Sequence, residues 1–239
     1  MKSQAHSSAI STLSPEARKF MVRAFIQMFI GLAITSACVY AFNTYDYCMR
    51  LLMDNEHISI LFWLSLLGPF LVSLIIRKGV NGLPYFSLCL LFIIYAALIG
   101  ICFSYIFIIF DLLDSSVFGI FMTACLAFGI MGIVGFTTRI DLTQARPILY
   151  WLGGGLIAVV PVVFLFPDLE MDLWVSWIGI IVFMGLGALH FSDLRDTADQ
   201  PGIDDITAKK LAVLCSLQLY IDFVNLFFFL VAFFFKRKD

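Results

Sequence analysis

Charged residues are scarce in this sequence. Of its 239 residues only 13% are Asp, Glu, Lys or Arg, whereas 62% are hydrophobic, and the mean hydropathy is +0.99. The longest polar stretch, roughly 192–210, is shorter than twenty residues. A soluble fold of this size could not bury so much apolar surface, and no soluble domain fits between the apolar runs. The scarcity of charge therefore predicts an integral membrane protein.

Features of secreted proteins and of enzymes are also missing. The first twenty residues lack the apolar core and cleavage site of a secretory signal, so we expect no segment to be removed. Of the six cysteines only Cys48 lies in a loop, which leaves no pair for a disulfide outside the membrane. The sequence contains no HExxH, GxSxG, Walker-loop or GxGD pattern, so we expect neither an enzyme nor a cofactor. Its basic residues lie at loop ends as anchors rather than in a clustered patch, and nucleic-acid binding is not expected.

Apolar runs long enough to cross a hydrocarbon core of roughly 30 Å recur seven times along the chain. These runs lack the alternation of a barrel strand, and in lipid the backbone groups must be satisfied within each segment, so helices are predicted. The predicted fold is all-α, with a cytoplasmic N-terminal segment (1–20) and a seven-helix transmembrane domain (21–239). The predicted spans are 21–42, 58–76, 83–110, 116–136, 148–166, 173–191 and 211–235.

The distribution of Lys and Arg predicts the orientation of the chain. Most of them precede the first span or occupy the second, fourth and sixth loops, whereas the other three loops hold Arg50 among eight acidic residues. Loops rich in Lys and Arg remain in the cytoplasm, so we expect a cytoplasmic N-terminus. The run 211–235 contains neither Gly nor Pro, which favours one continuous crossing helix over a re-entrant one. Without a cleavable signal or long extensions, the expected location is a bacterial inner membrane.

Glycines recur in the fourth and fifth predicted spans. Gly129, Gly132 and Gly135 follow one another at intervals of three residues, and Gly153 to Gly155 are consecutive. Small residues let helices approach closely in lipid, so all six glycines are expected to mark tight helix packing.

Asp222 lies near the middle of the last predicted span, where an ionised carboxylate is costly if it faces lipid. We therefore expect it to face protein or water. Gln218, Asp222 and Asn225 are spaced i, i+4 and i+7, which places them within a wedge of roughly 60° on one helix face. This polar stripe is either a hydrogen-bond cluster that holds helices together or a site that responds to protons or cations. In the second case Asp222 is the candidate ligand for a cation.

His190 ends the sixth predicted span, whereas His6 and His57 lie in the N-terminal segment and at a loop edge. Histidine can change its charge near neutral pH, so His190 is either a candidate switch or simply an interfacial side chain. If it meets Asp222, ionisation of each group favours ionisation of the other, whereas burial opposes both charges.

Two stretches resemble the transmembrane Bax-inhibitor-motif family. Residues 121–160 are similar to its pattern of a Phe, a Thr-Ala pair, spaced glycines, a Thr-(Lys/Arg)-x-Asp-Leu turn and a glycine-containing helix. Residues 217–234 are similar to its closing helix, Leu-Tyr-Leu-Asp-Phe-Ile-Asn-Leu-Phe, and residues 93–107 also fit. The order and spacing of the spans agree over essentially the whole chain. The resemblance implies a seven-helix bundle whose last helix is surrounded by the others, and a pH-sensitive leak of Ca²⁺ or other cations.

The resemblance also implies a proton-sensing pair. In bacterial members two aspartates are held to sense protons, one at the end of helix six and one within helix seven. Asp222 matches the second aspartate, while His190 stands at the position of the first. Asp193 follows three residues later on roughly the same helix face and is the other candidate. The predicted pH sensor and ion pathway therefore comprises Asp222, His190, Asp193, Asn225 and Gln218.

The leading hypothesis is a pH-dependent leak of cations, with Ca²⁺ as the expected ion, through a pathway lined by the last helix. The alternative is a non-conducting regulator that binds membrane proteases or cell-survival factors. In that case Asp222 holds helices together, and Asp222→Asn spares function because an amide keeps the hydrogen bonding. A proton-coupled transporter would be favoured by inverted repeats, and we detect none. The expected partners are the lipid bilayer, the cation and, for the alternative, other membrane proteins.

Overall fold

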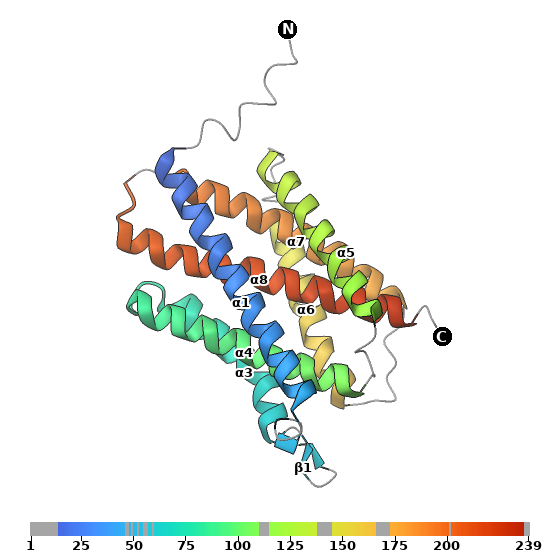
Figure 1. Cartoon of the computed structure of the whole chain (residues 1–239). Helices are drawn as coiled ribbons and strands as arrows, with labels where there is room; N and C mark the ends of the chain where they lie inside the picture. The colour runs from blue at the N-terminus through green and yellow to red at the C-terminus, as the bar shows by residue number, and fades with distance from the viewer. Residues whose placement is uncertain are drawn as a thin grey trace. The chain divides into compact units, whose positions relative to one another are not determined.

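The computed structural model describes residues 14–45, 60–109, 115–137, 145–165, 173–200 and 202–236, together with seven residues between 46 and 59. The described residues form seven helices: α1 (Pro15–Thr44), α3 (Ile60–Gly79), α4 (Tyr85–Ile109), α5 (Ser115–Thr137), α6 (Arg146–Leu165), α7 (Leu173–Ala198) and α8 (Asp205–Lys236). Two short strands, β1 (Met53–Asp54) and β2 (His57–Ile58), pair in antiparallel fashion between α1 and α3. Figure 1 shows the order of these elements along the chain.

Each predicted span corresponds to one helix, which confirms the all-α class and the seven helices. Five helices are long and apolar enough to cross a membrane, namely α1, α3, α4, α7 and α8. The described apolar parts of α5 and α6, Gly119–Gly135 and Arg146–Val159, are shorter. The prediction of a multi-pass membrane protein is therefore confirmed.

The polar segment 192–210, predicted to be a loop, is mostly helical because α7 and α8 both extend into it. The side chain of Asp204 caps α8, since its Oδ2 accepts a hydrogen bond of 3.1 Å from the Thr207 N–H. Hydrogen bonding with Thr207 also lowers the pKa of the Asp204 carboxyl. One turn into the helix, Lys209 pairs with Asp205 at 2.6 Å. These local polar interactions thus stabilise the first turns of α8, which precede the apolar run 211–235.

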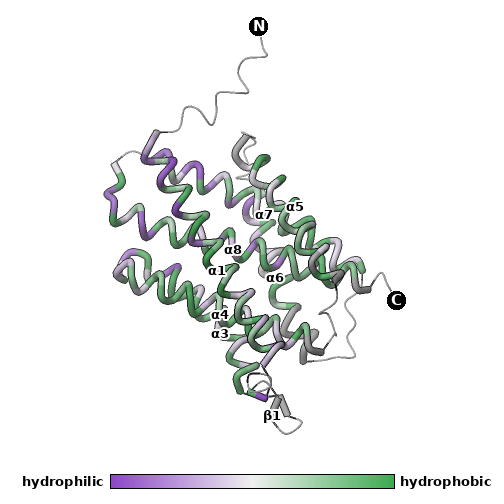
Figure 2. The backbone as a smooth tube through the Cα atoms, in the orientation of Figure 1, coloured by the Kyte–Doolittle hydropathy of each residue, from purple (hydrophilic) through white to green (hydrophobic). Residues whose placement is uncertain are grey.

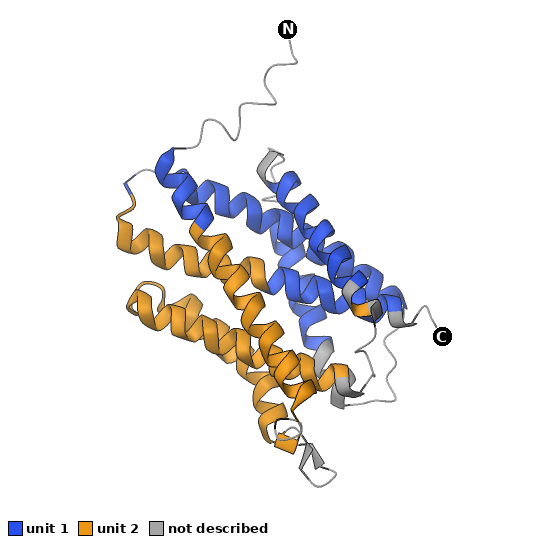
Figure 3. Ribbon diagram, viewed as in Figure 1, with its two compact units in different colours: residues 1–22, 118–202, 221–239 blue, residues 23–117, 203–220 orange. Residues whose placement is uncertain are grey.

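The helices belong to two compact units (Figure 3). Unit 1 comprises residues 1–22, 118–202 and 221–239, and within it α6 packs against α7. Unit 2 comprises residues 23–117 and 203–220, and within it α3 packs against α4. The first half of the long helix α8 belongs to unit 2, and its second half belongs to unit 1.

Helix α8 is the most enclosed of the candidate spans. In its most apolar window 61% of the residues are buried, against 17% to 50% in the other four. Figure 2 shows hydrophobic residues along the middle of most helices and hydrophilic ones mainly toward helix ends. Most residues of this window are buried by protein, and burial against protein lowers the cost of a polar side chain in an apolar helix.

Inside unit 2, Thr35 of α1 joins three helices. Its hydroxyl forms a hydrogen bond of 2.5 Å with the hydroxyl of Tyr220 on α8, in which either group can be the donor. It lies 3.0 Å from the carbonyl oxygen of Ala96 on α4. It also lies 3.1 Å from the carbonyl oxygen of Gly31 on its own helix. Thr35 and Tyr220 are 7% and 0% exposed, so this polar cluster satisfies groups that could not otherwise be buried.

Tight packing is observed for half of the six glycines discussed above. Three lie against α7: Gly132, Gly135 and Gly153. The prediction is wrong for the other three, which have no described atom within 4 Å of an added Cβ: Gly129, Gly154 and Gly155. A Cβ on Gly135 would lie 2.5 Å from the Ala188 carbonyl oxygen. Helix positions six residues apart differ in direction by about 120°, so Gly129 and Gly135 cannot face the same neighbour.

Candidate functional site

The polar stripe of α8 is only partly assembled into a site. Asp222 is 1% exposed, whereas Gln218 and Asn225 are half-buried. The Asn225 amide donates a 2.8 Å hydrogen bond to the Ile221 carbonyl oxygen of its own helix. Gln218 belongs to unit 2, while Asp222 and Asn225 belong to unit 1. Among the stripe residues, Asp222 is therefore the one that anchors the candidate site.

His190 of α7 is the partner of Asp222. Its Nδ1 lies 2.6 Å from Asp222 Oδ2, and both side chains are buried, at 5% and 1% exposure. This is short for a hydrogen bond between an imidazole nitrogen and a carboxylate oxygen, and hydrogen bonds to an ionised group are shorter than those between neutral groups. The contact connects α7 to α8 within unit 1.

Tyr150 of α6 is a third member of the site that sequence reasoning missed. Its hydroxyl lies 2.9 Å from His190 Nε2, so the two ring nitrogens of His190 contact Asp222 and Tyr150. A tyrosine in an apolar helix usually finds a polar partner for its hydroxyl, but nothing in the sequence sets Tyr150 apart from the other tyrosines. Only the packing of α6 on α7 shows which partner it is.

The partners determine what the imidazole can do. With Asp222 ionised and His190 neutral, Nδ1–H donates to the carboxylate and the bare Nε2 accepts from the Tyr150 hydroxyl. The three side chains then carry a net charge of minus one, and one added proton brings that charge to zero. In a buried place such a change has a larger electrostatic effect than at the surface. The arrangement can therefore bind a proton and convert it into a change of local charge.

Aromatic rings line α8 beside this cluster. Phe128 of α5 lies 5.0 Å from Phe191 and 5.4 Å from Phe223, between ring centroids. Phe121 lies 5.8 Å from Phe223, the residue that follows Asp222. These rings make the surroundings apolar, and an apolar environment raises the cost of any unpaired charge.

Asp193, the other candidate from the sequence, is engaged elsewhere. Both of its oxygens accept from the Arg146 guanidinium, at 3.0 Å (Nη1 to Oδ2) and 2.6 Å (Nη2 to Oδ1). The hydrogen bond with Asp193 is the main reason why the pKa of Arg146 is raised. Their side chains are 42% and 25% exposed, so the pair is worth about 0–1 kcal/mol. It connects the start of α6 to α7 one turn beyond His190.

In the part of the chain that the structure describes, metal-ligating side chains do not gather at this cluster. Within the described ranges no three His, Cys, Asp or Glu residues lie together as a metal site. Ca²⁺ takes six to eight oxygen ligands. The described contacts of Asp222 include an imidazole, which suits transition metals better than Ca²⁺.

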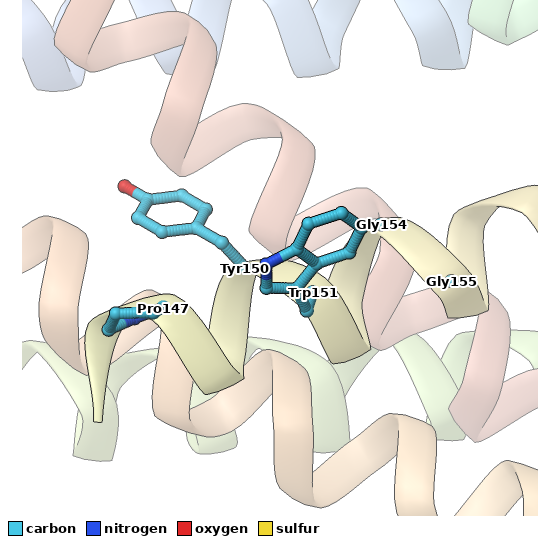
Figure 4. A pocket seen from close by; sticks show the side chains of 5 residues that line it. All are labelled: Pro147, Tyr150, Trp151, Gly154 and Gly155. Atoms are coloured by element: carbon cyan, nitrogen blue, oxygen red, sulfur yellow. The ribbon is translucent and has the colours of Figure 1, made fainter. Parts of the chain in front are cut away.

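The exposed face of α6 carries a groove beside Tyr150. It has a volume of about 560 Å³ and is lined by Pro147, Tyr150, Trp151, Gly154 and Gly155. Figure 4 shows these residues along one side of the helix, with the tyrosine and tryptophan rings projecting from it. Tyr150 thus contributes to an exposed surface with its ring and to the buried pair with its hydroxyl.

Comparisons with known proteins cover nearly the whole chain. The family profile described as inhibitor of apoptosis-promoting Bax1 matches residues 17–239. The inner membrane protein YbhL of Escherichia coli K12 is 30% identical over 233 residues, which cover 95% of this chain and 97% of YbhL. An uncharacterised protein of Borreliella burgdorferi is 31% identical over 221 residues, or 92% and 93% of the two chains. The similarity includes α6, α7 and α8, which carry the candidate site.

Proposed function

The chain belongs to the family of the inhibitor of apoptosis-promoting Bax1, and we propose that it is a pH-sensitive leak for Ca²⁺ or other cations. It is an integral membrane protein, as its apolar helices and its similarity to an inner membrane protein indicate. The observation that carries the proposal is the contact of 2.6 Å between His190 and Asp222, two titratable side chains buried in one unit.

The pair supports a pH response through its charge. In its deprotonated form the buried carboxylate makes the region around α8 negative, which favours a cation nearby. A proton taken up by either side chain removes that net charge. Because the effect is felt in apolar surroundings, one proton is enough to change the energy of a nearby cation substantially.

The pair also supports a response through helix contacts. The hydrogen bond joins α7 to α8, and a change of protonation changes which atoms donate and which accept. A switch of this kind shifts the equilibrium between two existing arrangements of the same helices and does not create a new arrangement. In the proposed mechanism Asp222 is the sensor and His190 is its partner. Helix α8 lines the pathway, to which it contributes Gln218 and Asn225.

We place the protein in a bacterial inner membrane with its N-terminus in the cytoplasm. The similarity to YbhL supports the membrane, and the excess of Lys and Arg before the first span and in the even-numbered loops supports the orientation. A reporter enzyme fused to the N-terminus, active only in the cytoplasm, tests this orientation directly.

The leak is tested with purified protein in liposomes that contain a Ca²⁺ dye. Influx is measured from pH 5 to 8 for wild type, Asp222→Asn and His190→Ala, with Asp193→Asn as the matched control. Asp193→Asn neutralises a carboxylate on α7 that is paired with Arg146 instead of His190. We expect Asp222→Asn to flatten the pH profile and Asp193→Asn to preserve it. Influx no greater than that of empty liposomes for all variants would refute the leak.

A non-conducting regulator of membrane proteases or other membrane proteins is the second candidate. It is favoured by the fact that Tyr150, His190 and Asp222 connect α6, α7 and α8, as a purely structural cluster would. Because an amide keeps much of the hydrogen bonding, Asp222→Asn would then leave function intact. Absence of a leak together with a stable Asp222→Asn protein would make this candidate the preferred one.

A further inference from the structure

Tyr150 extends the buried pair toward the surface of unit 1. Its side chain is 37% exposed and lines the groove on α6, whereas His190 and Asp222 are 5% and 1% exposed. Its hydroxyl lies 2.9 Å from His190 Nε2, and His190 Nδ1 lies 2.6 Å from Asp222 Oδ2. The three side chains thus form one continuous hydrogen-bonded chain across α6, α7 and α8.

A hydroxyl suits this position because it can reverse its role. While Nε2 of His190 carries no hydrogen, the Tyr150 hydroxyl donates to it. When His190 is protonated, Nε2–H donates and the Tyr150 oxygen accepts. A phenylalanine could do neither. The loss would be felt most after protonation, because a buried N–H without an acceptor is less tolerated than an acceptor without a donor.

We propose that Tyr150 is the positioning residue of the buried pair, and that its hydroxyl sets the pH at which His190 and Asp222 take up a proton. As a statement about the leak, this inference rests on the function proposed above. As a statement about proton binding it stands on the geometry of the three side chains alone.

Along α6 and α7, the charged side chains nearest to Tyr150 and His190 are paired with each other. Arg146, one turn before Tyr150, holds Asp193, one turn after His190, in a two-bond ion pair. Further along α7, Arg195 pairs with Asp196 and lies 3.5 Å from the Gly135 carbonyl oxygen of α5. The same helix α5 presents aromatic rings to α8. The two ion pairs largely cancel their own charges, whereas the Tyr150 hydroxyl contacts His190 Nε2 directly and can respond to its protonation.

Proton binding can be observed at His190 without measuring any leak. Replacing His6 and His57 with glutamine leaves His190 as the single histidine of the three in the chain. Full-length protein labelled with ¹⁵N-histidine is placed in lipid nanodiscs, and the ring nitrogen signals are followed by NMR as a function of pH. Tyr150→Phe is compared with Trp151→Phe, which changes the neighbouring ring of the same groove.

We expect Tyr150→Phe to move the midpoint of the signal change to lower pH by about 0.5 to 1 unit, the effect of losing a hydrogen bond that is stronger in the protonated form. Trp151→Phe should leave the midpoint in place. The comparison protein, called the parent, carries only the glutamine replacements of His6 and His57. Equal midpoints for Tyr150→Phe and this parent would overturn the inference. The parent provides a second measurement: above the midpoint Nδ1 should carry the hydrogen and Nε2 should be bare, and the opposite tautomer would also overturn it.

The leak assay separates this inference from the proposed function. If Asp222→Asn flattens the leak profile while Tyr150→Phe leaves the NMR midpoint unchanged, the role of Tyr150 is refuted and the leak stands. If the NMR midpoint shifts as expected but no variant leaks, the leak is refuted and the role of Tyr150 in proton binding stands.

Discussion

Asp222 Oδ2 lies 2.6 Å from His190 Nδ1, and neither side chain is more than 5% exposed. A carboxylate in the middle of an apolar helix is thereby given a donor on a neighbouring helix, within protein. The pairing explains how the chain accommodates a group that lipid would reject.

Loss of the imidazole should destabilise the protein. His190→Leu removes the donor to a buried carboxylate and should lower the free energy of unfolding by about 1–3 kcal/mol. The double variant with Asp222→Leu should lose less than His190→Leu alone, because no charge then remains buried. Thermal unfolding in detergent measures both. A double variant less stable than either single variant would show that the pair is not the source of the effect.

Gly135 should tolerate no side chain, because an added Cβ would lie 2.5 Å from the Ala188 carbonyl oxygen and 2.5 Å from the Phe191 Cβ. Gly135→Ala should therefore force α5 away from α7 and destabilise the protein by about 1–3 kcal/mol. Gly129→Ala on the same helix is the matched control. It meets no described atom and should be neutral or slightly stabilising, as alanine is the better helix former. Equal melting temperatures for the two variants would contradict this packing.

The Thr35 hydroxyl should stabilise unit 2. Thr35→Val keeps the shape of the side chain but removes the partner of the fully buried Tyr220 hydroxyl, at a cost of about 1–3 kcal/mol. Ser36→Ala serves as the control on the next residue, because the Ser36 hydroxyl is exposed and, among the described residues, bonds to the Leu32 carbonyl oxygen of its own helix. Unfolding followed by circular dichroism distinguishes them, and a Thr35→Val protein as stable as wild type would contradict the role of this cluster.

The Arg146–Asp193 pair should matter little for stability and not at all for pH sensing. Both side chains are partly exposed, so Asp193→Asn should lower the free energy of unfolding by at most about 1 kcal/mol, and less at high salt. Melting curves at two salt concentrations test the first statement. If Asp193→Asn flattened the leak profile, the sensor would have to be placed at this pair instead of at Asp222.

Much of the fold could be predicted from the sequence, because the length of an apolar run is determined by the thickness of the bilayer. The ends of the helices could not. Hydropathy stops α7 near Phe191 and starts α8 near Leu211, whereas ion pairs and the cap at Asp204 extend both helices into polar sequence.

The candidate site could be predicted in part. Asp222 and His190 are conspicuous because their side chains are out of place in an apolar span. Tyr150 is not conspicuous, since tyrosine is common in membrane helices and its role depends on how α6 packs on α7. The role of Asp193 also could not be predicted from its sequence position. In the folded chain its carboxylate pairs with Arg146 instead of joining the site.

A double-variant cycle on the Ca²⁺ leak in liposomes tests whether Asp222 and His190 sense protons together. Wild type, Asp222→Asn, His190→Gln and the double variant are compared from pH 5 to 8. If the two side chains sense protons as one unit, each single change should remove the pH dependence and the double variant should resemble the single ones. Independent effects that add in the double variant, or a pH profile that survives Asp222→Asn, would show that the two side chains are not the proton sensor.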